Sequence, residues 1–398
     1  MAAGKEHTVL LRSDGTAVAW GCNKYLQCNI PSLPEKVKYI QVAAGAYHTV
    51  FLRDDNRVVA CGYNTDGRCK IPSYNDYIQV AAGTSHTVLL REDGTVVACG
   101  DNEHGECVVP ALENKQTYKQ IAAGCDITVL IRSDGGAIAF GRNNEQQCNI
   151  PTLKGGLKYI QAAAGSNHTV LLRSDGTVVF CGKHRINHKS PHEGYLQCWP
   201  ASFAYTRVAA GGRRTVLLRS DGECVVFDNV VQGRMMYPNR DYEEWPYEYL
   251  TRAPLCEQLS PATDGSAKFT EVATGGKHTI LLTSAGKAWA YGSNSLLQCN
   301  FPLLSGDIKY VPNLLPELVL TASWDNTSMH FTTMGSTLVT SIFVTPDTSF
   351  LDVYCQLMRE IGGMHCRVKV VLPNDSELSL LVSEKPLGCV GELESVRV

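Results

Sequence analysis

The chain lacks a long apolar run, an excess of charge of either sign, and any catalytic signature. No stretch approaches the roughly 20 apolar residues that a membrane span needs, so none is predicted. The 36 Lys and Arg residues nearly balance the 39 Asp and Glu residues, which argues against a broad surface for nucleic acid. Nucleophile-elbow, phosphate-loop, HExxH and kinase motifs are all missing. The sequence therefore predicts a protein that is not an enzyme and needs no cofactor.

Targeting and cross-linking signals are missing as well. Repeat sequence begins at the N-terminus, which leaves no room for a signal or transit peptide. The 16 cysteines include no Cys-x-x-Cys pair, so a zinc site of the usual spacing is not expected. Many of them recur at equivalent repeat positions, which lie too far apart in different repeats for disulfides to form. We therefore expect free thiols and a reducing intracellular compartment, the cytoplasm or the nucleus.

What the chain does contain is one internal repeat, seen most fully over 80–110. Small residues and a Gly open each unit, followed by two variable residues, His-Thr, an apolar strand, Asp-Gly and another strand. Seven units are visible, at Gly4, Gly45, Gly83, Gly124, Gly165, Gly211 and Gly275, with steps of 41, 38, 41, 41, 46 and 64 residues. Short strands with a period near 40 predict a β-propeller with one blade per unit. Asp-Gly predicts a tight type I′ hairpin turn inside each blade.

This order of motifs is similar to the regulator of chromosome condensation repeat family. It most resembles the short variants that end in Gln-Cys-Asn-x-Pro, and the resemblance covers residues 4–302. It implies a seven-bladed β-propeller, which we assign to residues 1–312. The founder of the family is a guanine-nucleotide exchange factor for a small GTPase, but its dedicated wedge has no counterpart residue by residue here. The plant ultraviolet-B photoreceptor of the family carries tryptophans in the variable pairs, and none occurs here.

The first unit lacks the strand that precedes Gly45, which reads Lys-Tyr-Ile-Gln-Val. After the seventh unit, residues 307–311 resemble that missing strand. We expect this segment to complete the first blade, which would join the two ends of the ring and leave no exposed edge. An alternative interpretation takes residues 319–331 as a degenerate eighth repeat.

Beyond residue 316 the repeat ends and a different module begins. Residues 329–331 and 337–344, with a turn at Gly335, predict a hairpin, and residues 345–361 carry an apolar stripe at helical spacing. Strands are expected at 367–372, 377–382 and 394–398. This is the order of a β-grasp, and residues 329–398 resemble ubiquitin-like domains, which usually act in docking. The prediction is thus a mainly β chain with a small C-terminal α+β domain after a linker at 313–328.

The repeat glycines and histidines are expected to be structural. A ring of imidazoles could suggest metal or acid–base chemistry, but Ile127 and Arg214 occupy the same position in two units. We expect each His to begin a strand and to bond backbone in its own blade or the next. The predicted structural positions are Gly4, Gly45, Gly83, Gly124, Gly165, Gly211, Gly275, His7, His48, His86, His168 and His278. No metal site is predicted, because Pro191 interrupts the helical spacing of His184, His188 and His192.

The candidate binding residues lie where the repeat varies. A long insertion in the sixth unit carries five aromatic residues: Tyr237, Tyr242, Trp245, Tyr247 and Tyr249. Tyr and Trp are enriched where interfaces bind most strongly, although these rings could instead pack on the propeller's own flank. The variable pairs should cluster near one mouth of the ring, and they supply Tyr47 and Arg213, with Arg214 next to the latter.

These observations predict a non-enzymatic scaffold or adaptor that binds protein partners through its propeller loops and its ubiquitin-like domain, as a subunit of a larger assembly. One alternative is a guanine-nucleotide exchange factor for a small GTPase. Another is the substrate-recognition part of a ubiquitin-ligase system, with catalysis on a separate chain, because nothing here has the length of a HECT domain.

Overall fold

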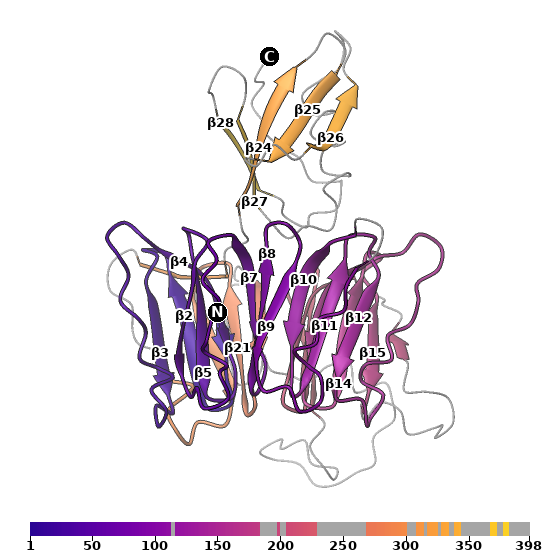
Figure 1. Cartoon of the computed structure of the whole chain (residues 1–398). Helices are drawn as coiled ribbons and strands as arrows, with labels where there is room; N and C mark the ends of the chain where they lie inside the picture. The colour runs from indigo at the N-terminus through magenta and orange to yellow at the C-terminus, as the bar shows by residue number, and fades with distance from the viewer. Residues whose placement is uncertain are drawn as a thin grey trace. The chain divides into compact units, whose positions relative to one another are not determined.

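The structure, a computed structural model, describes residues 1–112, 116–183, 197–199, 204–228, 268–300, 308–313, 317–324, 328–333, 338–343, 367–371 and 377–381. The chain divides into two compact units, Met1–Leu314 and Leu315–Val398. Every regular element within the described ranges is a strand, which confirms the mainly β prediction (Figure 1). Accordingly, the described part of the chain holds no helix that could cross a membrane.

The sheets of the first unit repeat one pattern of three antiparallel strands. In the second repeat, β4 (Tyr39–Ala44) pairs with β5 (His48–Arg53), which pairs with β6 (Val58–Gly62). The middle strand is buried along most of its length because neighbouring sheets cover both of its faces. Alternating strands of five or six residues are typical of propeller blades.

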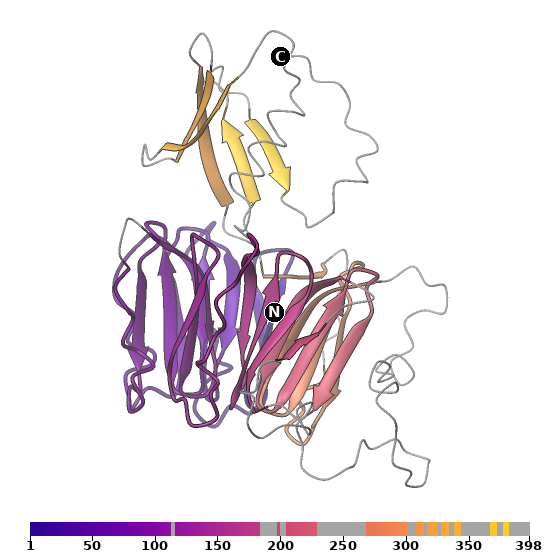
Figure 2. The same ribbon diagram turned by 90° about the vertical axis from the view of Figure 1, so that its right-hand side faces the viewer.

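The same order of strands recurs along the chain. The sheets are β7 (Tyr77–Ala82), β8 (His86–Arg91) and β9 (Val96–Gly100); β10 (Tyr118–Ala123), β11 (Ile127–Arg132) and β12 (Ala137–Gly141); β13 (Tyr159–Ala164), β14 (His168–Arg173), β15 (Val178–Gly182) and β16 (Gln197–Trp199); β17 (Tyr205–Gly211), β18 (Arg214–Arg219) and β19 (Cys224–Asp228); and β20 (Phe269–Thr274), β21 (His278–Thr283) and β22 (Ala288–Gly292). Successive sheets lie side by side around a ring (Figures 1 and 2).

The ring is closed by a strand made of both ends of the first unit. In the first repeat, β2 (His7–Arg12) pairs with β3 (Ala17–Gly21) on one side. On its other side it pairs with β1 (Ala2–Ala3) and with β23 (Tyr310–Val311). The pair of Arg12 with Tyr310 repeats that of Arg53 with Tyr39, so β23 and β1 together replace a first strand. This confirms the predicted closure, and we number the seven sheets of this unit as blades 1 to 7.

The hydrophobic core lies between neighbouring blades. Val9 and Leu11 of blade 1 pack against Tyr39 and Phe51 of blade 2, and similar clusters join the following blades. At the closure, Leu10 packs against Ile280 of blade 7. Each blade therefore buries its apolar surface on both neighbours, which explains why one unit alone could not form a stable core.

The hairpin turns differ from the predicted type I′ geometry. In blade 1 only Gly15 has a positive φ (+86°), and Asp14 does not. Gly15 N–H donates to Arg12 C=O, and Arg12 N–H donates to Thr16 C=O. This is a type I turn followed by a bulge residue in the left-handed region. Asp14 favours it because its carboxylate accepts the Thr16 N–H at 2.8 Å.

The second unit contains one described sheet of five strands. They are β24 (Glu317–Trp324), β25 (Ser328–Thr333), β26 (Leu338–Phe343), β27 (Arg367–Val371) and β28 (Glu377–Leu381), in the order β26-β25-β24-β27-β28. The β25–β26 hairpin and the strands at 367–371 and 377–381 agree with the sequence analysis.

One expectation and one alternative interpretation for this region do not hold. Residues 317–324 were assigned to the linker, but they form β24, which pairs in parallel with β27. Residues 319–331 are not an eighth blade, because β24 and β25 belong to this second sheet. The predicted helix at 345–361 and the last strand at 394–398 lie outside the described residues. The ubiquitin-like β-grasp therefore stays a prediction.

Candidate interaction site

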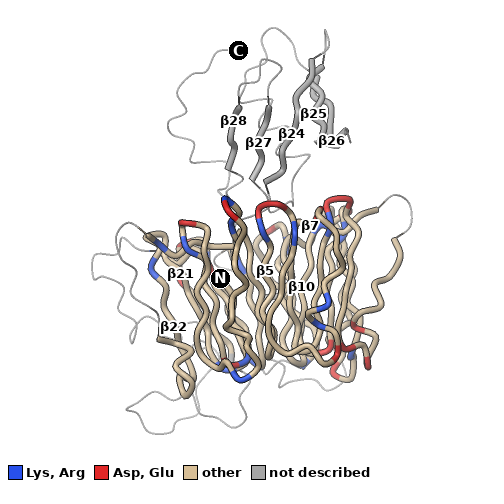
Figure 3. The backbone as a smooth tube through the Cα atoms, turned by 60° about the vertical axis from the view of Figure 1, so that its left-hand side comes forward, with Lys and Arg blue, Asp and Glu red and all other residues tan. Residues whose placement is uncertain are grey.

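The variable pairs all lie on one face of the ring. In blade 2 the first strand ends at Ala44, and the third strand ends at Gly62 opposite His48, so both ends reach the same face. We call this the pair face; it is formed by the turns after the first strands and by the loops after the third strands as far as the repeat Cys, beyond which the chain returns to the opposite face. The opposite face carries the Asp-Gly hairpin turns, where basic and acidic residues alternate along the upper end of the ring in Figure 3.

The repeat glycines bring the turns of the pair face into backbone contact. A Cβ on Gly45 would lie 2.3 Å from the carbonyl oxygen of Gly83, so only glycine fits. The turns are joined by hydrogen bonds between blades: Lys5 N–H donates to Gly45 C=O at 3.2 Å, and Thr84 N–H donates to Gly124 C=O at 3.0 Å. These glycines thus allow the turns of neighbouring blades to approach one another closely at the axis of the ring.

This ring of turns surrounds a cavity of about 590 Å³. Its wall is made of the Ala-Gly segments of blades 1 to 6 and of Thr274-Gly275 in blade 7. Side chains of the variable pairs border it: Lys5, Thr84, Cys125, Ser166, Arg213 and Lys277. The expectation that the variable pairs cluster at one mouth of the ring agrees with this arrangement. A cavity lined by small residues, with polar side chains at its border, is suited to binding.

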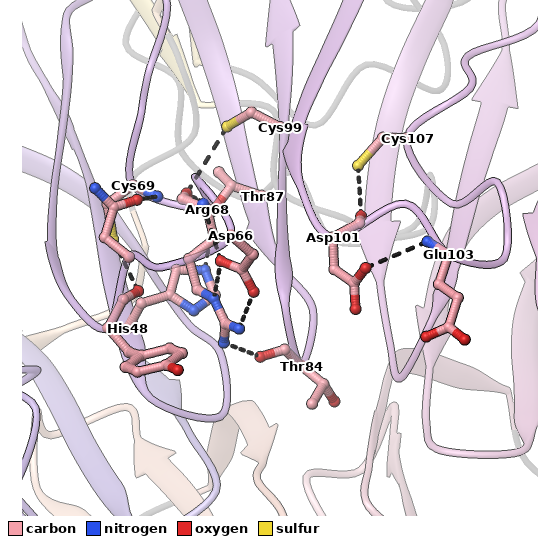
Figure 4. A network of polar contacts seen from close by, with 12 residues as sticks. His48, Asp66, Arg68, Cys69, Thr84, Thr87, Cys99, Asp101, Glu103 and Cys107 are labelled. Carbon is pink, nitrogen blue, oxygen red and sulfur yellow. Dashed lines mark hydrogen bonds and ion pairs between the residues drawn. The ribbon is translucent and has the colours of Figure 1, made fainter.

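The repeat histidines form buried hydrogen bonds from one blade to the next. His48 Nε2 lies 3.0 Å from Thr87 Oγ1, and that hydroxyl donates to Arg68 C=O at 2.8 Å (Figure 4). Because the hydroxyl hydrogen is already used, His48 must be the donor in this bond, through Nε2–H. The equivalent pairs are His7–Thr49, His86–Thr128, His168–Thr215 and His278–Thr8. The partner of each Nε2 is therefore a threonine side chain of the next blade, whereas the expected bond to backbone is seen for His168, which also bonds the Arg214 backbone.

Burial holds these histidines in the neutral form. It lowers the pKa of His48 to about 3, and positive Arg68 nearby adds to the effect. The pKa of His86 is lowered to about 4, again mainly by burial. Both imidazoles are fully buried, and the Nε2 of each is bonded to a threonine hydroxyl of the next blade. The arrangement supports a structural role for them.

The residue before the repeat Cys was missed by the sequence analysis. It is Gln in four units, and in three of them, at Gln27, Gln147 and Gln298, the side-chain oxygen accepts a backbone N–H of its own loop. In blade 2 it is Arg68, which pairs with Asp66 and donates to Thr84 C=O of the next variable pair at 2.9 Å. Figure 4 shows this guanidinium between the two loops. In the sequence, the change from Gln-Cys in other repeats to Arg68-Cys69 in the second was the signal that could have revealed this role.

Blade 3 carries a carboxylate at the same position. Glu106 is fully buried, and its Oε2 accepts the His104 N–H at 2.9 Å. Burial raises the pKa of Glu106, and the nearby Asp101 and Asp126 carboxylates raise it further. Asp126 belongs to the variable pair of blade 4 and lies 3.7 Å from Arg142. Blades 3 and 4 therefore present mostly acidic groups on the pair face.

Tyr47, one of the predicted binding residues, belongs to an aromatic cluster on this face. Its ring contacts Tyr25 of blade 1 edge to face, with centroids 5.1 Å apart, and Tyr25 contacts Tyr63 at 4.9 Å. The Tyr47 hydroxyl accepts a hydrogen bond from Lys5 Nζ at 2.8 Å, and this bond raises the pKa of Lys5. The three rings are half-buried, so part of the cluster faces solvent.

Arg213 and Arg214 occupy the corresponding turn of blade 6. Arg213 is exposed at the border of the cavity. Arg214 takes the place of the repeat His, and its Nη1 donates to Lys277 C=O of blade 7 at 3.0 Å. Lys277 Nζ in turn pairs with Glu6 of blade 1 at 2.6 Å. The basic residues of the pair face thus gather on three adjacent blades, 6, 7 and 1.

The five aromatic residues of the sixth-unit insertion, residues 237–250, lie outside the described residues. The described strand before it, β19, ends at Asp228 opposite Arg214, which is on the pair face. The insertion of the fifth unit follows β15, whose end at Gly182 lies opposite His168 on the same face. The enlarged segments therefore begin at the face that also carries the variable pairs.

The repeats match a known family. Residues 1–27, 39–68, 77–106 and 269–298, in blades 1, 2, 3 and 7, match the family model of the regulator of chromosome condensation (RCC1) repeat. Together with the closed ring of sheets, these matches support a β-propeller that carries RCC1 repeats in blades 1, 2, 3 and 7. No curated protein sequence matches the chain.

Solved structures share this fold at low sequence identity. Human WBSCR16 is similar with a TM-score of 0.55 and 18% identity, over 70% of this chain and 79% of that chain. Yeast RCC1 (Prp20), solved bound to Kap60, gives 0.54 and 20% over 69% and 77%. The ectodomain of the Arabidopsis thaliana receptor kinase ACR4 gives 0.51 and 16% over 74% and 93%. These likenesses show the propeller fold.

Proposed function

We propose that the chain is a non-enzymatic scaffold that binds protein partners through the pair face of its propeller. The observation that carries this proposal is the contrast between frame and surface on that face. Glycines and His–Thr bonds fix the turns of the ring, while the residues between them differ in every blade. Varied side chains on a rigid frame are typical of a recognition surface.

The likeness to yeast RCC1 supports the proposal only through the fold, but that protein was solved in complex with a protein, Kap60. The described cysteines of this chain are all free, which supports a reducing intracellular compartment as its site of action. We propose in addition that residues 329–398 form a ubiquitin-like docking domain and that the chain acts as a subunit of a larger assembly.

The proposal is tested by capture of partners from native extract, with crosslinking mass spectrometry to locate the contacts. We expect crosslinks from Lys5, Lys24 and Lys277, and we expect the double variant Tyr47→Ala, Arg213→Glu to lose partners. Replacement of residues 237–250 by a Gly-Ser linker tests the aromatic insertion separately. Glu92→Lys, on the opposite face, is the control. An unchanged set of partners in every pair-face variant would overturn the proposal.

A second candidate is guanine-nucleotide exchange on a small GTPase, favoured by the match to RCC1 repeats. Nucleotide release from a panel of GTPases discriminates the two, because a scaffold accelerates none of them. A third candidate is substrate recognition for a ubiquitin ligase, and copurification of ligase subunits in the same capture would favour it.

A further inference from the structure

Two exposed leucines occupy strained backbone positions on the pair face. Leu26 of blade 1 and Leu297 of blade 7 are 59% and 61% exposed, with φ of +65° and +62°. Blades 2 and 3 carry glycine at the same loop position, Gly67 and Gly105. A bulky side chain is disfavoured at positive φ, and neither leucine gains much burial there. The fold does not account for leucine at these positions, which points to an external contact.

The two leucines belong to an apolar arc on the adjacent blades 7 and 1. Leu296 and Tyr291 of blade 7 are also exposed, at 40% and 37%. The blade 7 loop adjoins blade 1, where the Trp20 indole donates to Gln298 C=O at 3.1 Å. The blade 1 loop in turn adjoins blade 2 through the edge contact of Tyr25. We define the apolar arc as Tyr25, Leu26, Tyr291, Leu296 and Leu297.

Basic side chains run alongside the apolar arc. We define the basic sector as Lys5, Lys24, Arg213, Arg214 and Lys277, from blades 1, 6 and 7. Glu6 and Asp228 are the acidic residues among the described residues of the same turns and loops. Blades 3 and 4 have the opposite balance, with Asp101, Glu103, Glu106, Asp126 and Glu145 against Arg142. The pair face is thus divided into a basic side with exposed apolar groups and an acidic side.

We propose that the basic sector and the apolar arc together bind an acidic segment of a partner protein that carries leucine-like side chains between its carboxylates. This inference rests on the proposed function and names the chemistry of the partner. Carboxylates would pair with Lys5, Arg213 and Lys277, while apolar side chains would cover Leu26 and Leu297. The acidic side of the face orients such a segment, because it repels the same carboxylates.

The test is fluorescence anisotropy of a labelled 12-residue peptide with alternating Glu and Leu, added to the full chain. We expect saturable binding that weakens as salt is raised. Lys5→Glu with Lys277→Glu should weaken it by about tenfold or more, since two attractive contacts become repulsive. Leu26→Gly with Leu297→Gly should weaken it by about fivefold, because apolar contact is lost.

Matched controls keep the test independent of folding. Gln146→Gly removes the side chain from the same loop position of blade 4, where φ is +62°, and Lys154→Glu makes the same charge change away from the pair face. Both should bind the probe as the parent chain does. Circular dichroism and melting of each variant exclude loss of fold as the cause of weaker binding.

Five results would overturn the inference, and the last of them leaves the proposed function standing. The first is equal binding of a peptide in which Ser replaces Leu, and the second is unchanged binding by the charge-reversed variant. The third is equal affinity for a single-stranded oligonucleotide of the same charge, which would indicate a general polyanion site. The fourth is binding only after residues 237–250 are replaced by a Gly-Ser linker, which would make that segment the occupant. Partner capture that depends on the pair face while the probe does not bind sinks this inference and leaves the proposed function standing.

Discussion

At the scale of single residues, glycine has two different roles in this propeller. Gly45 has an ordinary φ, but the carbonyl of the next blade lies where its Cβ would be. Gly105 has a φ of +84°, and nothing lies within 4 Å of a Cβ placed there. The first glycine is required by packing between blades and the second by the local backbone alone. The same residue type therefore carries different free-energy costs when it is replaced.

We predict that Gly45→Ala destabilises the propeller far more than Gly105→Ala. A Cβ at Gly105 costs only the left-handed conformation, about 1 kcal/mol. A Cβ at Gly45 forces two backbone segments apart and should cost about 3 kcal/mol or more. Urea denaturation of the full chain measures both values. Equal losses of stability in the two variants would show that close packing between blades is not the reason for glycine at position 45.

A converse prediction concerns the strained leucines. Leu297→Gly should leave the free energy of unfolding unchanged or raise it by up to about 1 kcal/mol, because relief of positive φ offsets the entropy cost of glycine. Thermal melting checks this, with Leu296→Gly as the control at a neighbouring exposed position of ordinary φ. A clear loss of stability in Leu297→Gly alone would mean that the leucine serves the fold.

Some residue roles could be predicted from the sequence and others could not. His48 was expected to be structural because another repeat replaces the same His with Ile127, and burial between blades bears out that role. Its bond to Thr87 depends on the neighbouring blade, which a linear pattern does not show. The role of Arg68 was missed for the same reason, since Thr84 is 16 residues away in sequence and in another blade.

At the scale of elements, the closure of blade 1 is the least continuous part of the ring. Its inner strand consists of two short pieces, β1 and β23, whereas every other blade uses one strand. Asn313 compensates for the break: its Oδ1 accepts the Val42 N–H at 3.1 Å and its Nδ2 donates to Val42 C=O at 3.1 Å. In blade 2 the Gln41 side chain has this role toward Val80. The resemblance of residues 307–311 to a first strand predicted the closure, but not this replacement.

We predict that Asn313→Ala opens the ring locally. The buried Val42 groups would lose their partner, at a cost of about 1–3 kcal/mol. Amide hydrogen exchange should become faster in β2, because one half of its inner partner strand is released. Gln41→Ala is the matched control, since it removes the equivalent bond inside a continuous strand. If the two variants show the same pattern of amide exchange, the closure of blade 1 is no weaker than the rest of the ring.

At the scale of the whole molecule, the fold was more predictable than the binding surface. Seven glycine spacings define the blades because each unit must bury its apolar faces on its neighbours. The basic sector was only partly predictable. Arg213 and Arg214 stand out within one turn, but Lys5 and Lys277 are 272 residues apart and meet only because the ring closes. Residues that closure brings together carry no short-range signal in the sequence.

The five buried histidines also act on the whole molecule, because their contributions to its pH dependence add. Burial lowers the pKa of His7 and His48 to about 3 and that of His86, His168 and His278 to about 4, below the unfolded value of 6.5. The unfolded chain therefore binds more protons between these values. Stability is fully present above pH 6.5 and falls as the pH is lowered toward 4. Glu106, whose pKa is raised, contributes with the opposite sign.

Between pH 7 and pH 5 each of these histidines should cost about 2 kcal/mol, since the unfolded imidazole gains a proton that the folded one cannot. Because the stability of a typical domain is only about 5–15 kcal/mol, the propeller should lose a large part of its stability on mild acidification. Urea denaturation of the full chain at pH 5, 6 and 7 measures the slope. His86→Gln should be less stable than the parent chain at pH 7. Between pH 7 and pH 5, however, it should lose about 2 kcal/mol less stability, which is the contribution of one histidine. A slope that is the same in parent and variant would mean that His86 does not stay neutral in the folded ring.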